Sequence, residues 1–169
     1  VPKALSLGVV QKVLRNLLEE GVPLRDMRTI IETLADMAPR YQDSEVLTAQ
    51  VRTALGRSIV QELYPGGAEM QIISLDPQLE RLLMQAVGAG GDGSGIEPGL
   101  ADTLVREAVA AAQHQEEVGL PTVLLVPGNL RTLLSRFLRR SIPQLKVLAH
   151  AEVPESRVIK VTSIIGQRV

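Results

Sequence analysis

Apolar and polar residues in the first third of the chain recur with the 3.6-residue spacing of amphipathic helices. Each of three successive segments repeats apolar residues three and four positions apart, which places them on one helical face. The residues expected to face inward are Leu7, Val10, Leu14, Leu17, Leu18, Met27, Ile30, Ile31, Leu34, Ala38, Leu47, Val51, Ala54, Leu55 and Ile59. The pattern predicts a unit of three packed helices over residues 3–64.

Residues that cap or break helices mark the ends of these segments. Gly21 stands where a C-terminal cap belongs, and Pro39 closes the second helix. Asp43 or Ser44 can begin the third helix, because either side chain can accept a hydrogen bond from a backbone N–H. The sequence Tyr-Pro-Gly-Gly at 64–67 then interrupts the helical period. We therefore expect a domain boundary after this turn.

Beyond the turn, short apolar runs alternate with amphipathic segments. The continuous run "TVLLV" is typical of a strand that is covered on both faces. The expected elements are a strand at 70–75, helices at 77–87 and 98–117, a strand at 122–126, a helix at 130–141, and strands at 146–150 and 158–164. This alternation predicts a small α/β domain with a mixed sheet of about four strands. The helical domain would span 1–67 and the α/β domain 68–169.

Composition and charge exclude several classes of function. Of the 169 residues, 45% are hydrophobic and 22% are charged, the formal net charge is −1, and there is no Cys. Without Cys the chain has no disulfide, thiolate nucleophile or thiolate metal ligand. The even balance of charges argues against a partner that is a nucleic acid. No apolar run approaches the roughly 20 residues that a membrane-spanning helix needs, so we expect this part of the chain not to span a membrane.

Short motifs in the second domain lack the residues that catalysis or ligand binding would need. The glycine-rich segment Gly88–Gly95 has no P-loop lysine and fits no dinucleotide-binding pattern, so we interpret it as a surface loop. His114 and His150 have no neighbouring nucleophile or set of metal ligands in the sequence. The adjacent acidic pairs at 19–20 and 116–117 diverge around a helix instead of converging. We therefore expect no catalytic residue, no cofactor and no metal ion.

Two other classes of function stay open on the residues alone. An α/β enzyme could assemble a site from scattered acidic and Arg side chains, which converging carboxylates or a bound anion would reveal. A helix-turn-helix DNA-binding module could use the helices on either side of the Gly-Val-Pro turn at 21–23. Arg25 and Arg28 on the second of these helices suit phosphate. Asp26 and Glu32 on the same helix would repel it, so charge argues against DNA.

Two further features bear on contacts with other proteins. The segment "RTLLSRFLRR" is the richest basic cluster, and it fits a docking face as well as a plain solvated face. Gly8 and Gly56 lie inside predicted helices, where each costs about 1 kcal/mol relative to Ala. Close contact with a neighbouring helix, within the domain or between subunits, would be a physical reason for these glycines.

Five segments together resemble the type III export-gate family. They are "VVQKVLRNLLEEGVPLRDMRTIIETLAD", "VRTALGRSIV", "SLDPQLE", "VLLVPGNLRTLLSRFLRRSIPQLKVLAHAEVP" and "VIKVTSIIG", in the family's order. The resemblance spans nearly the whole chain. The segment "SRFLRRSIPQLKVL" is closer to the flagellar branch than to the injectisome branch. The segment "LAHAEVP" differs mildly from the family's usual "LSxxEIP".

The resemblance implies a non-enzymatic piece of a flagellar protein export gate. Family members have a membrane portion and then a cytoplasmic domain of four subdomains, of which this chain would be the last two. Their cytoplasmic domains form a nonameric ring with other copies, receive chaperone–substrate complexes and respond to the export ATPase complex. The helical subdomain is implicated in ring contacts. The parent protein would lie in the bacterial inner membrane, with this piece on the cytoplasmic side. An injectisome homologue is the alternative within the family.

On this basis we expect particular charged residues to contact other proteins. The candidates are Arg15, Glu19, Arg25, Asp26, Arg28, Arg131, Arg136, Arg139 and Arg140. The first five lie on the amphipathic helices around the Gly-Val-Pro turn, and the last four form the basic cluster. Each surface ion pair contributes only about 0–1 kcal/mol, so a ring would need many of them together with apolar contact.

Overall fold

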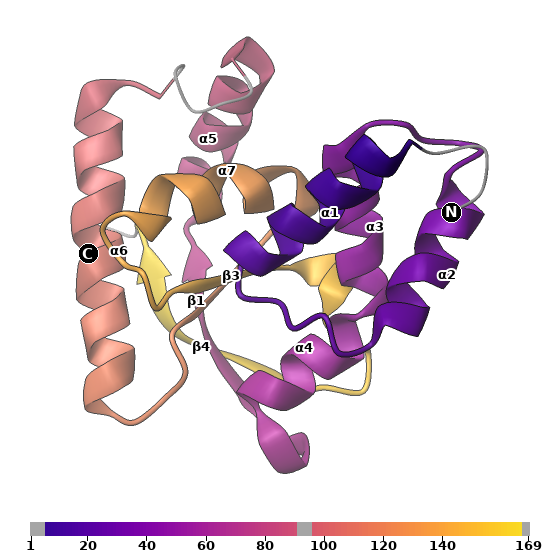
Figure 1. The fold of residues 1–169 in the computed structure, drawn as a ribbon. Coiled ribbons are helices and arrows are strands. Elements are labelled where there is room, and N and C mark those ends of the chain that lie inside the picture. The colour runs from indigo at the N-terminus through magenta and orange to yellow at the C-terminus, as the bar shows by residue number, and fades with distance from the viewer. Residues whose placement is uncertain (1–5, 91–95, 167–169) are drawn as a thin grey trace. The chain divides into compact units, whose positions relative to one another are not determined.

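Residue contacts divide the chain into two compact units. The computed structural model describes residues 6–90 and 96–166. The first unit runs through Pro65 and also contains Ala151–Pro154, and the second comprises Gly66–His150 and the residues from Glu155 onward. Four residues from late in the chain therefore complete a unit that is otherwise built from its beginning (Figure 1).

Over its described residues, the first unit has four α-helices in place of the predicted three. They are α1 (Leu7–Glu19), α2 (Met27–Met37), α3 (Ser44–Ala54) and α4 (Gly56–Leu63). The predicted third helix is interrupted at Leu55, whose φ of −90° and ψ of 1° lie outside the α-helical range. Sequence periodicity could not reveal this break, because Val51 before it and Ile59 after it are both buried in the core.

The helical core is narrower than the apolar pattern predicts. Its buried residues include Val10, Val13, Leu17, Ile30, Leu34, Ala38, Leu47, Val51, Leu55 and Ile59. The inward positions predicted for Leu7, Leu18, Met27, Ile31 and Ala54 are wrong, since these side chains are exposed. In this unit α1 and α2 both pack against α3, so only the strip of each helix that faces α3 is covered.

The second unit is a parallel sheet with helices. Its elements are β1 (Met70–Leu75), α5 (Pro77–Gly90), α6 (Pro98–Glu117), β2 (Val123–Val126), α7 (Gly128–Arg139), β3 (Lys146–Ala149) and β4 (Ile159–Ile165). Short 3-10 turns at Pro65–Gly67 and His150–Glu152 stand where the chain passes from one unit to the other. The strands lie in the order β3-β2-β1-β4, and every paired strand is parallel. The prediction of four strands is confirmed, but the prediction of a mixed sheet is wrong. The chain after β3 crosses to the far edge of the sheet instead of turning back.

Local signals predicted most of these elements well. The strand at 70–75 and the helix at 98–117 are confirmed with the same bounds. The helix predicted to end near Val87 continues to Gly90, and residues 91–95 of the predicted glycine-rich loop lie outside the described residues. Helices α5, α6 and α7 contribute Leu83, Leu104 and Leu130 to one core with alternate residues of the strands.

A buried cluster of charges holds the late segment in the first unit. Arg52 on α3 is 2% exposed and Glu152 is 3% exposed. The Arg52 Nε donates to Glu152 Oε2 at 2.6 Å, and its Nη2 donates to Glu152 Oε1 at 3.1 Å. The Arg52 Nη1 lies 3.6 Å from Glu20 Oε1 at the end of α1. A bidentate, charge-assisted pair of this kind fixes both distance and orientation.

Gly56 is required by the same segment. A Cβ at this position would overlap the backbone carbonyl oxygen of Glu152 and would lie 2.9 Å from its carbonyl carbon. At Gly8, by contrast, an added Cβ would lie 3.9 Å from Ser6 Oγ, an ordinary van der Waals contact. The close contact expected for the helix-interior glycines therefore exists at Gly56, where the neighbour is an irregular segment and not a helix.

No helix among residues 6–90 and 96–166 combines the length and the hydropathy that a bilayer crossing requires.

The Glu152→Ala variant should lose about 3 kcal/mol of unfolding free energy, because it leaves the Arg52 guanidinium buried with its bidentate partner removed. Urea denaturation followed by circular dichroism measures this change. The control is Glu155→Ala, an exposed position that should change stability by less than about 0.5 kcal/mol. Equal stability of the two variants would show that the buried pair does not hold the segment.

Gly8, the second residue of α1, and Gly56, the first residue of α4, should respond in opposite directions to substitution by Ala. Gly56→Ala should destabilise the chain by about 1–3 kcal/mol, since the new Cβ forces the Glu152 backbone away. Gly8→Ala should stabilise it by up to about 1 kcal/mol, because the position is open and Ala favours helix. Thermal denaturation of both variants gives the comparison, and a stabilised Gly56→Ala variant contradicts the assigned contact.

Candidate protein-interaction site

A small hollow lies where the turn between α1 and α2 meets α4. Its volume is about 150 Å³. It is lined by Val22, Pro23, Arg25, Asp26, Leu55, Ser58, Ile59 and Glu62, all of which belong to the first unit. The floor is apolar and the rim is charged, so the hollow can receive an apolar side chain framed by ion pairs.

The local sequence builds this hollow from two sides. Gly21 adopts a φ of 73°, which ends α1 and lets the Val22 N–H reach the Leu17 carbonyl at 2.9 Å. Val22 is thereby buried, and Pro23 follows it along the wall. Opposite, Leu55, Ser58, Ile59 and Glu62 follow the i, i+3, i+4 and i+7 spacing, which puts them on one side of α4.

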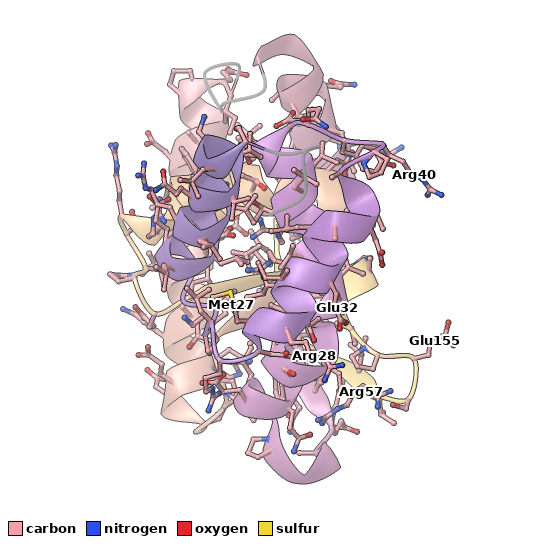
Figure 2. All side chains as sticks on the ribbon, turned by 45° about the vertical axis from the view of Figure 1, so that its right-hand side comes forward. Met27, Arg28, Glu32, Arg40, Arg57 and Glu155 are labelled. Carbon is pink, nitrogen blue, oxygen red and sulfur yellow. The ribbon has the colours of Figure 1, made fainter. Side chains whose placement is uncertain are left out.

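The charged rim is made of solvent-exposed pairs. Arg25 Nη2 donates to Glu62 Oε2 at 3.3 Å, with the two side chains 80% and 52% exposed. One turn into α2, Arg28 Nε donates to Glu32 Oε1 at 3.0 Å. Figure 2 shows Met27, Arg28 and Glu32 at the surface of this helix. Pairs this exposed add little to the stability of the unit and can exchange partners at low cost.

Asp26 has a structural role that the sequence analysis did not assign. It is the N-cap of α2: its Oδ1 accepts the Thr29 backbone N–H at 3.1 Å, and its Oδ2 accepts the Thr29 hydroxyl at 2.6 Å. These hydrogen bonds, the hydroxyl first, lower the pKa of the Asp26 carboxyl. The carboxylate therefore stays ionised at neutral pH and holds the start of α2 beside the hollow.

The structure separates the predicted interaction residues into groups. Arg25 and Asp26 line the hollow, and Arg28 lies close by on α2. Arg15 and Glu19 are exposed on α1 but are not among the lining residues. In the second unit, Arg136, Arg139 and Arg140 are exposed at the end of α7.

Arg131 differs from the rest of the basic cluster. Its side chain is 4% exposed, and its Nη2 donates to the Thr132 hydroxyl at 3.1 Å. A buried guanidinium is not presented to a partner in this structure, so Arg131 is set apart from the exposed arginines of α7. The amphipathic spacing could have revealed this, because Leu130, Leu134 and Leu138 place the buried side of the helix next to Arg131.

Sequence reasoning missed the apolar floor and the partner of Arg25. Leu55 and Ile59 were assigned to the core alone, and Glu62 was not considered. The signal was the seven-residue interval from Leu55 to Glu62, which returns to the same helical side. Among the described residues, no group of three or more His, Asp or Glu side chains could hold a metal ion.

Comparison with known proteins identifies relatives over nearly the full chain. Residues 1–158 match the FHIPEP family. The flagellar biosynthesis protein FlhA of Salmonella typhimurium is 55% identical over 166 residues, which cover 98% of this chain and 24% of that protein. FlhA of Escherichia coli K12 is 54% identical over 166 residues, which also cover 98% of this chain and 24% of that protein. The chain thus spans about a quarter of the length of these relatives.

Solved structures share the fold. Shigella flexneri MxiA superposes with a TM-score of 0.84 at 25% identity, covering 96% of this chain and 52% of that one. The nonameric EPEC SctV-C superposes with a TM-score of 0.80 at 26% identity, and the match covers 96% of this chain and 49% of that one. The nonameric EscV cytosolic domain from the type III secretion system has a TM-score of 0.71 at 25% identity, and the match covers 92% of this chain and 46% of that one. The resemblance inferred from the sequence is confirmed, and the chain belongs to the FHIPEP family.

Proposed function

We propose that this chain is part of the cytoplasmic portion of a flagellar type III protein export gate. It acts by assembling with other copies and docking partner proteins, and it does not catalyse a reaction. The observation that carries this proposal is the 55% identity to a flagellar FlhA over 98% of the chain. The parent protein would lie in the bacterial inner membrane, with these residues on the cytoplasmic side.

The flagellar branch is favoured over an injectisome homologue. The two flagellar relatives described above are 54–55% identical to the chain, whereas the EPEC SctV-C and MxiA structures are 25–26% identical. The alternatives of an α/β enzyme and a DNA-binding module gain no support from these relatives. The domains proposed from the sequence, 1–67 for ring contacts and 68–169 for the α/β part, remain our working division.

The hollow beside the α1–α2 turn is the part of this chain that we assign to ring assembly. Two of the similar solved structures are described as nonameric. In our proposal, the charged rim of Arg25 and Arg28 meets a neighbouring copy, and the apolar floor at Leu55 and Ile59 receives one of its side chains. The other proposed partners are export chaperone–substrate complexes and components of the export ATPase complex.

The rim offers a direct test of assembly. Reversing both charges, Arg25→Glu with Arg28→Glu, in the complete cytoplasmic domain should weaken self-association at least about tenfold, since two attractive contacts per interface become repulsive. Analytical ultracentrifugation measures the association. Circular dichroism should show unchanged helical content, because both intramolecular pairs are exposed.

A matched control separates site from net charge. Arg81→Glu with Arg106→Glu makes the same charge change at two exposed positions of the second unit. This control should assemble like the unaltered domain. If both double variants assemble equally well, the rim is not a subunit contact; if both fail equally, the effect comes from net charge and the rim loses its assigned role.

A further inference from the structure

Strand β4 is an edge strand with an unusually apolar exposed surface. It pairs with β1, and no described strand pairs with its other side. Three apolar side chains of the strand are exposed, Ile159 by 43%, Val161 by 47% and Ile164 by 41%, and Val158 just before it is exposed by 64%. Strands of parallel sheets are normally covered on both faces, so this surface departs from the rule that the rest of the sheet follows.

A β-bulge gathers three of these side chains on one face. The register shifts between Ile72 and Ile73 of β1, which oppose Val161 and Ser163 of β4 and leave Thr162 as the extra residue. Side chains otherwise alternate along a strand. With one residue added, Val161 and Ile164 lie on the same face although they are three positions apart. Ile159 lies two positions before Val161, so it extends the same stripe.

The bulge is held by a buried side chain and is not a fraying edge. Gln115 on α6 is fully buried, and its Nε2 donates to the carbonyls of Gln71 and Pro121 at 3.1 Å. Its Oε1 accepts the Thr162 hydroxyl at 2.7 Å. These contacts fix the extra residue in place, so the apolar stripe is a permanent feature of the strand.

Beside the stripe lies a wide hollow with positive character. Its volume is about 470 Å³. The residues that line it are Gln71, His114, Val118, Leu120, Lys160, Val161 and Thr162. Lys160 is exposed and forms no ion pair with a described residue, and the lining contains no carboxylate. A ligand that carries a carboxylate would therefore complement this surface.

A lysine on an edge strand can serve only to prevent aggregation, and this is the alternative explanation for Lys160. Edges protected in this way are short, or carry charges among few apolar residues. Strand β4 has seven residues, and its one lysine, Lys160, is the second of them, with the apolar side chains of Ile159 and Val161 next to it in the strand. One lysine is too little protection for so large an apolar surface. This favours a strand whose edge is covered by a partner when the protein functions.

We propose that β4 and the adjoining hollow bind an extended segment of a partner protein, which adds a strand to the sheet. The segment carries alternating apolar side chains for the stripe of Ile159, Val161 and Ile164, and a carboxylate for Lys160. Backbone hydrogen bonds along the open edge supply affinity, and the side chains supply specificity. The proposal stands on the strand itself and does not depend on the function proposed above.

A second copy of the chain fits this site less well. Pairing through the same strand would bring a second Arg157 and a second Lys160 to the edge. Residues 156–166 contain no carboxylate to offset them. Like charges brought together at an interface are unfavourable, so the charge pattern selects an acidic partner.

The test uses the 169-residue chain and a fluorescein-labelled synthetic peptide of about ten residues, the length of a long strand, that alternates valine and glutamate. Fluorescence anisotropy measures binding, and hydrogen exchange by mass spectrometry locates it. We expect binding with slowed exchange in residues 158–165. A peptide with alternate amides N-methylated, and one with lysine in place of glutamate, should each bind at least about fivefold more weakly.

Variants of the chain test the charge assignment. Lys160→Glu should weaken binding of the acidic peptide at least about fivefold and improve binding of the lysine peptide. Lys12→Glu makes the same change at an exposed position of α1 and should leave both affinities unchanged. Four results would overturn the proposal: no slowed exchange in β4, equal binding of both peptides, a peptide that becomes helical when bound, or a chain that associates with itself through β4 in sedimentation.

Discussion

The interaction on which the structure most depends is the buried pair of Arg52 and Glu152, one hundred residues apart in the sequence. Neither group would remain buried without the other, because removing a full charge from water costs several kcal/mol. The geometry that offsets this cost is strict, with two short hydrogen bonds between planar groups. Glu152 is thereby held at one place and one orientation against α3.

The consequences of this pair extend along the chain in both directions. The Glu152 backbone lies against Gly56, so the first residue of α4 must lack a Cβ. In the sequence, Ala151–Pro154 comes between β3 and β4, so the chain passes through this segment before the last strand. The last strand then joins the far edge of the sheet, parallel to β1, in place of a hairpin beside β3. The ion pair therefore fixes a segment whose backbone contacts Gly56 beside the helix break, and which comes before β4 in the sequence.

The exposed ion pairs of the first unit differ in energetic weight from the buried pair of Arg52 and Glu152. The hollow by the α1–α2 turn combines an apolar floor with exposed ion pairs that contribute little within the unit. Charges in this situation are available to a neighbour, whereas Arg52 and Glu152 are committed to the fold. The same residue types therefore form ion pairs of different energetic weight, and burial makes the difference.

The sequence by itself determined the elements whose cause is local. Helix α6 and strand β1 were predicted with their observed bounds, because periodicity, caps and turn residues act over a few positions. The family was also evident, since long segments carry its pattern. Only the tertiary structure decided the burial of Arg52, the break at Leu55, the parallel β4 and the apolar stripe. Each of these depends on a partner distant in sequence, such as Glu152 for Arg52 or Gln115 for the bulge at Thr162. A linear pattern records the character of a residue but not the group that it meets, and the energy of a buried charge or an edge strand is decided by that group.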